Sequence, residues 1–85
     1  MIKPTIERKH MGGAQKLYFF PNGYGASVIK NIGSYGHEED LWELGVIKGS
    51  PADWGLCYGT KITDDVLGWL SDEKVEEILI QIEGL

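Results

Sequence analysis

Cysteine is nearly missing from this sequence, since Cys57 is the single cysteine among 85 residues. One cysteine excludes an intramolecular disulfide, on which many small secreted domains rely. The basic start Met1-Ile2-Lys3-Pro4 is not followed by the apolar segment of a signal peptide. The sequence also has no apolar run near the roughly 18 to 20 residues that a membrane-spanning helix needs. We therefore expect a soluble cytoplasmic protein with no membrane contact.

Residues 1–15 have no apolar periodicity. They contain Pro4 and the pair Gly12-Gly13, which interrupt regular structure. The sequence therefore predicts a flexible N-terminal arm at residues 1–15 and one folded domain at residues 16–85. A chain of this length has room for one hydrophobic core, so a second domain is not expected.

Three to four segments have the pattern of β-strands. Residues 16–20 and 24–30 flank Pro21-Asn22-Gly23, which is typical of a hairpin turn. Residues 41–48 alternate apolar with polar or small side chains, as a half-buried strand does. Residues 54–58 follow a further turn and place bulky side chains on one face. These segments predict a small antiparallel β-meander.

The pattern becomes helical after residue 62. Thr63 precedes two acids, which is typical of a helix start, and predicts a short helix through Leu67. Ser71 has the position of an N-cap for a second helix that ends at Gly84. The apolar stripe of this helix consists of Val75, Ile78, Leu79 and Ile82. The predicted fold class is α+β, with the meander packed against a C-terminal helix that a short helix precedes.

The sequence has few side chains suited to nucleophilic catalysis. His10 and His37 are the only imidazoles, and Cys57 is the only thiol. A Cys-His pair would need one histidine beside the thiol and a third group to orient it, and no motif indicates either. Between Leu56 and Tyr58, the cysteine is expected to be a small buried apolar residue. We therefore expect no enzyme and no cofactor.

The acidic residues do not form a metal-binding motif. Asp64 and Asp65, with Asp40 or Glu43, could offer oxygen ligands, but the spacing of a calcium loop is missing. The formal net charge is −5. Acids are concentrated in residues 63–85, where an acidic helix face is either simply solvated or binds a basic partner. An acidic protein repels phosphates, so direct nucleic-acid binding is disfavoured.

Aromatic side chains are the strongest indication of a partner. In residues 16–20, Leu17 and Phe19 face one side of the strand while Tyr18 and Phe20 face the other. One helix can cover only one face of a sheet. Aromatic side chains on the other face are either packed into a core by another segment or accessible as an association surface, and the sequence leaves both possibilities open. We expect partner binding to depend on aromatic residues outside the helix-covered face. The predicted partner-binding residues are Tyr24, Tyr35, Trp42 and Trp54, with Asp64 and Asp65 as charged neighbours.

Four segments resemble a family of small proteins of unassigned function encoded by bacteriophages and prophages. They are residues 20–28, 41–44, 56–58 and 62–70. The family often has an acid and a proline where this chain has Gly59 and Lys61, and residues 1–15 have no counterpart in it. The resemblance implies a phage or prophage gene expressed in the cytoplasm of a bacterial host, and it implies no activity.

These observations predict a non-catalytic accessory protein that binds a host protein, with inhibition of a host defence as one form of that role. The alternative is a small structural or assembly homo-oligomer, which the apolar side chains on both faces of residues 16–20 favour. An enzyme ranks last, because no pair of reacting groups can be placed.

Overall fold

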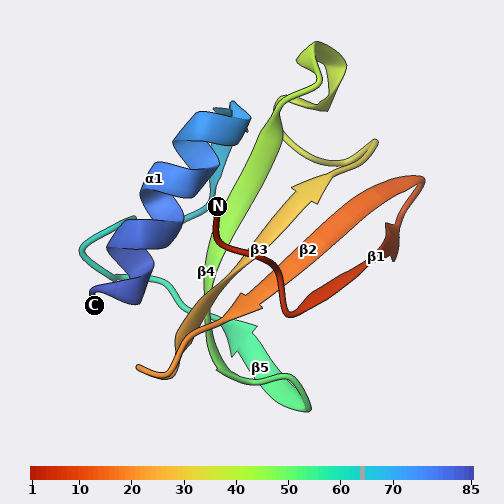
Figure 1. Ribbon diagram of the computed structural model, residues 1–85. Helices are drawn as coiled ribbons and strands as arrows, with labels where there is room; N and C mark the ends of the chain where they lie inside the picture. The colour runs from red at the N-terminus through yellow and green to blue at the C-terminus, as the bar shows by residue number, and fades with distance from the viewer. Residues whose placement is uncertain (64) are drawn as a thin grey trace.

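The chain folds into a curled antiparallel β-sheet with one α-helix against it (Figure 1). The structure is a computed structural model that describes residues 1–63 and 65–85. The α+β class is confirmed, but the sheet has six strands where three to four were predicted. The elements are β1 (Ile6–His10), β2 (Gly13–Phe19), β3 (Tyr24–Lys30), a 3-10 turn (His37–Glu39), β4 (Trp42–Ser50), β5 (Asp53–Leu56), β6 (Leu67–Leu70) and α1 (Asp72–Glu83).

The hairpin of β2 and β3 forms around the predicted turn. Phe19 pairs with Gly25 beside the turn, and the register continues to Ala14 opposite Lys30. The Asn22 side chain accepts a hydrogen bond from the Tyr24 amide at 3.0 Å, which fixes the turn locally. Its amide nitrogen also donates to the Ile82 carbonyl at the end of α1, at 2.9 Å. One turn residue therefore joins the hairpin to the helix.

Strand β4 lies at the centre of the pairing. One edge of β4 pairs with β3, from Glu43 to Lys48. The other edge is divided, because Trp42 and Leu44 pair with β6 while residues 47–50 pair with β5. The strand predicted at residues 41–48 is confirmed, and β5 matches the predicted fourth strand over residues 54–56.

The short helix predicted from Thr63 through Leu67 is wrong. Residues 67–70 form strand β6, and no helix lies between β5 and β6 among the described residues. The Thr60 hydroxyl accepts hydrogen bonds from the amides of Ile62 and Thr63, and the Thr63 hydroxyl accepts one from Asp65. These side-chain bonds give the backbone an alternative to helical pairing.

Residues 1–15 belong to the folded unit, which corrects the prediction of an arm outside it. Strand β1 pairs antiparallel with β2, and the predicted boundary at residues 15 and 16 falls inside β2. The Thr5 amide donates to the Leu17 carbonyl at 2.7 Å, and Ile6 lies opposite Leu17. Apolar periodicity is weak in β1 because most of its residues are exposed on a sheet edge. The strand is held in place by its pairing with β2.

Helix α1 covers one face of the sheet, as the apolar stripe predicts (Figure 1). The Ser71 hydroxyl accepts the Lys74 amide and caps the first turn, and Gly84 ends the helix as predicted. The four stripe residues are buried against β3, β4 and β6. The core beneath the helix consists of Tyr18, Ala26, Val28, Trp42, Leu44, Val46, Leu70, Val75, Ile78, Leu79 and Ile82.

Leu79→Ala should lower the free energy of unfolding by about 2–5 kcal/mol, because it leaves a cavity at a fully buried position. Denaturant unfolding followed by circular dichroism measures the change. Ile80→Ala is the matched control, since the neighbouring Ile80 is 56% exposed and should change stability far less. An unchanged unfolding midpoint for Leu79→Ala would contradict the helix packing.

Candidate functional site

Among the described residues, no helix covers the sheet face opposite α1. Leu17 and Ile47 are nearly fully buried on this face although they lie outside the core beneath the helix. Their cross-strand neighbours are Ile6 and Leu56, on the two strands that flank the curled sheet. The curl therefore buries part of this face without a second layer.

A groove of about 280 Å³ lies on this open face. Its base includes Gln15, Ser27 and Gly45, from three successive strands. Arg8 and His10 of β1 line the groove, as do Trp54 and Leu56 of β5. We call this the open-face groove; its lining residues are Arg8, His10, Gln15, Ser27, Ile29, Glu43, Gly45, Trp54, Leu56 and Val66.

Gly45 leaves room for two apolar side chains at the base of the groove. A Cβ at this position would lie 2.9 Å from Leu56 Cδ2 and 3.4 Å from Val66 Cγ1. Leu56 and Val66 can approach β4 because the side chain is missing there. Any larger residue would fill the groove or push Leu56 away.

A hydrogen-bond chain runs along the lining of the groove, from the exposed Arg8 to the buried pair Gln15 and Ser27. The Arg8 Nε–H donates to Gln15 Oε1 at 2.7 Å, and Gln15 Nε2 donates to Ser27 Oγ at 2.9 Å. Gln15 is only 4% exposed, so each of its polar atoms needs a protein partner. This series of hydrogen bonds holds the Arg8 guanidinium through Nε, and its two terminal nitrogens make no hydrogen bond among the described residues.

The charged groups of the groove are not paired with each other. Ion pairs among the described residues join Glu7 to Lys16, Asp40 to Lys30 and Glu77 to Lys74, and none includes Arg8. Glu43 uses one carboxylate oxygen to accept the Tyr35 amide at 3.0 Å. This hydrogen bond connects the groove to a pair of exposed aromatic rings.

Tyr35 and Trp69 stack on each other at the surface. Their ring centroids are 5.5 Å apart at an interplanar angle of 28°. Each side chain is 58% exposed, and exposed Ile32 lines the same depression. We call Tyr35, Trp69 and Ile32 the aromatic patch. Glu38 and Glu39 lie at its rim.

The backbone at Trp69 is strained. Its φ is +55°, in the left-handed region that a bulky residue seldom adopts. A Cβ at the preceding residue, Gly68, would lie 2.6 Å from the Tyr35 Cβ, so Tyr35 lies directly against the backbone. Strain of this kind costs on the order of 1–3 kcal/mol and tends to occur at functional sites.

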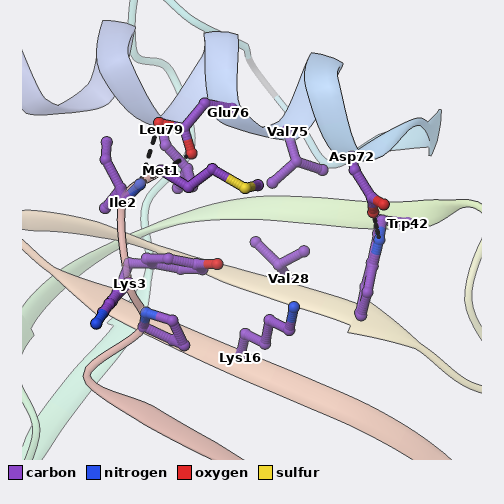
Figure 2. Close-up of a pocket in the computed structure, with 12 residues that line it drawn as sticks. Met1, Ile2, Lys3, Lys16, Val28, Trp42, Asp72, Val75, Glu76 and Leu79 are labelled. Atoms are coloured by element: carbon purple, nitrogen blue, oxygen red, sulfur yellow. Dashed lines mark hydrogen bonds between the residues drawn. The ribbon is translucent and has the colours of Figure 1, made fainter.

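A second cavity of about 260 Å³ lies between the N-terminal residues, α1 and the sheet (Figure 2). Trp42 Nε1 donates to Asp72 at 2.8 Å, and the Ile2 amide donates to Glu76 at 3.1 Å. The ammonium of Lys16, which lines this cavity, lies 4.9 Å from the centroid of the Trp42 ring. The polar groups of this cavity are thus largely engaged in holding residues 1–4 and α1 onto the sheet.

The described residues offer no metal centre, since no group of three or more His, Cys, Asp or Glu side chains comes together in them. Cys57 is partly buried and packs against the core, close to its expected role. Its amide donates to the Val46 carbonyl at 2.7 Å.

Two of the predicted partner-binding residues lie on the wrong face. Trp42 is 9% exposed in the core beneath α1, where Asp72 holds its indole nitrogen. Tyr24 packs against the same core, with the Lys48 ammonium 5.3 Å from its ring centroid. The expectation that both lie outside the helix-covered face is therefore wrong, because the register of β3 and β4 directs them toward α1.

The other predicted residues lie apart from that core. Tyr35 is in the aromatic patch and Trp54 lines the open-face groove. Asp65 is exposed, and its carboxylate accepts the Val66 amide at 2.8 Å. Asp64 lies outside the described residues.

The sequence reasoning missed Trp69 and Arg8. Trp69 lies between the two predicted helices, where no sequence pattern singles it out. Arg8 lies within residues 1–15, for which the sequence predicts an arm. The spacing of Arg8 and Gln15 on either side of the Gly12-Gly13 pair could have indicated a hairpin that joins them.

Comparisons with protein-family models, with curated proteins and with solved structures give no match to this chain. In the described part of the chain, no helix has the length and apolar character needed to cross a bilayer.

Tyr18, which lines the second cavity, should make the stability of the fold depend on pH in the alkaline range. Burial raises the pKa of Tyr18 above 10, and the charges of Glu76 and Glu7 raise it further. The unfolded chain therefore loses this proton first as pH rises, so the contribution to stability is complete below pH 10 and declines above it. Tyr18→Phe should reduce that decline in urea unfolding between pH 9 and pH 11. Tyr58→Phe is the control at an exposed ring, and an equal effect of both would contradict the assignment.

Proposed function

We propose that the protein is a non-catalytic binding module that attaches to a protein partner through the aromatic patch. The observation that carries the proposal is the exposed Trp69 ring, held on a strained backbone and stacked on Tyr35. Tryptophan and tyrosine supply much of the energy in protein interfaces. Exposing the Trp69 ring to water does not offset the backbone strain, whereas burying the ring against a partner would.

The charge around the patch favours a basic partner. Glu38, Glu39 and Asp40 follow the patch in the loop before β4, and the whole chain carries −5. An interface of this kind combines an apolar centre with a charged rim, and the rim acts mainly on association rate and specificity. A partner with an apolar pocket bordered by lysine or arginine fits this description.

The resemblance to phage and prophage proteins suggests that this partner is a host protein, and blocking a defence protein is one consequence of such binding. The alternative, a structural homo-oligomer, would use the same patch against a second copy. These two proposals differ in what the patch contacts, so one set of variants tests both.

Trp69→Ala and Tyr35→Ala should each weaken partner binding by about 2 kcal/mol or more, since they remove rings at the centre of the interface. The immobilised protein first captures its partner from bacterial lysate, and biolayer interferometry then measures affinity for each purified variant. Tyr58→Ala is the matched control, because Tyr58 is 57% exposed and lies elsewhere. Aromatic variants that fold and bind like wild type would contradict the proposal.

Trp69→Gly separates binding from stability. Glycine relaxes the positive φ, and this relief offsets the lost ring stacking, so the free energy of unfolding should stay within about 1 kcal/mol of wild type. Partner binding should nevertheless be lost. If light scattering instead finds a defined oligomer that Trp69→Gly dissociates, the homo-oligomer replaces the partner-binding proposal.

A further inference from the structure

We propose that the open-face groove binds a short peptide with a free C-terminal carboxylate. None of the residues of the aromatic patch lines this groove, so the site goes beyond the proposed function. The proposal is based on the charge arrangement in the groove, on the hydrogen bond that holds the exposed Arg8 to the buried Gln15, and on the size of the space.

The carboxylate would bind to Arg8. The Nε–H of Arg8 is bonded to Gln15, and Gln15 is in turn bonded to Ser27 in the lining of the groove. This arrangement orients the guanidinium before a ligand arrives, which lowers the entropic cost of binding. The terminal nitrogens have no acidic partner among the described residues. A planar guanidinium with two free donors matches a carboxylate in bidentate geometry.

The surrounding charges favour a carboxylate over a phosphate. Glu43 lines the same groove, and the chain has a net charge of −5. A phosphate dianion would meet one guanidinium and one carboxylate, whereas a peptide carries one charge of each sign at its two ends. The groove is thus complementary to a zwitterion.

The separation of the two charges sets the length of the ligand. Arg8, Gln15, Ile29 and Glu43 form one row across four neighbouring strands. Three strand spacings span about 14 Å in a flat sheet, and inward side chains on a curled sheet shorten the distance between charged groups. One amino acid is too short to join them, while three extended residues span roughly 10 Å. A tripeptide can place its amino group at the free oxygen of Glu43.

The remaining walls suit an apolar side chain. Trp54 and Leu56 line the β5 side, and Gly45 leaves the base hollow. The volume of about 280 Å³ is just below the roughly 300–1,000 Å³ of typical small-molecule sites. A peptide of two to four residues with one apolar side chain fits this space.

The test is calorimetric titration of the full chain with alanyl-leucyl-alanine as the free acid and as the C-terminal amide. The free acid should bind at least about tenfold more tightly, because the amide loses a charge-assisted bidentate contact. Amide chemical shifts of Gln15, Ser27 and Gly45 should move with the acid. This comparison uses the wild-type protein and does not depend on the folding of any variant.

Arg8→Gln should weaken binding of the free acid about tenfold and leave the amide unchanged. Lys9→Gln is the matched control, since it removes the same charge at the neighbouring residue of β1, which does not line the groove. Gly45→Ala should also weaken binding, because its methyl group enters the base of the groove. Trp69→Ala should leave the peptide affinity unchanged, which separates this site from the aromatic patch.

Three results would overturn the proposal: equal affinity for acid and amide, equal effects of Arg8→Gln and Lys9→Gln, or displacement of the peptide by millimolar inorganic phosphate. Chemical shifts that move around Tyr35 and leave the groove unaffected would place the peptide elsewhere and would also overturn it. None of these results bears on partner binding through Trp69, so the two proposals fail independently.

Discussion

The register of strand β4 determines which side chains form the core and which form the groove. Trp42, Leu44 and Val46 face α1, while Glu43 and Gly45 line the opposite face. Pairing with β3 on one edge and with β5 and β6 on the other holds this register along the strand. A shift by one residue would bury a carboxylate beneath the helix and expose the largest apolar side chains. Core and groove therefore depend on one set of backbone hydrogen bonds.

The two faces of the sheet serve different purposes. The face under α1 is largely apolar, and the helix residues Asp72 and Glu76 accept hydrogen bonds from Trp42 on this face and from Ile2. The opposite face keeps polar groups in its interior, with Gln15 and Ser27 satisfied by each other and by Arg8. Buried polar chains of this kind contribute little net stability, but they fix the geometry of the groups they hold. The face without a helix therefore carries the charged group that a buried polar residue holds, which is the Arg8 guanidinium bonded to Gln15.

The parts of the fold that could be predicted from sequence are those with local signals. The turn around Asn22 and the cap at Ser71 act within a few residues, and both were predicted correctly. Strands β1 and β6 were missed because their order comes from pairing with distant segments. The same limit applies to the site. Tyr24 and Trp42 are aromatic residues on strands, and only the register decides that they face the helix. The exposure of Trp69 depends on its positive φ, which no sequence pattern shows.

The Asn22 side chain joins segments separated by about 60 residues, since its nitrogen donates to the carbonyls of Ile82, Glu83 and Leu85. The Ile82 carbonyl also accepts the Leu85 amide at 3.1 Å, so the Asn22 side chain adds a second hydrogen bond to this carbonyl. Asn22 therefore ties the residues that end α1 to the turn of the hairpin. Hairpin and helix end should behave as one cooperative unit, opening together on the timescale of global unfolding. Hydrogen exchange would then find slow amides at a chain end, where fraying is normally fastest.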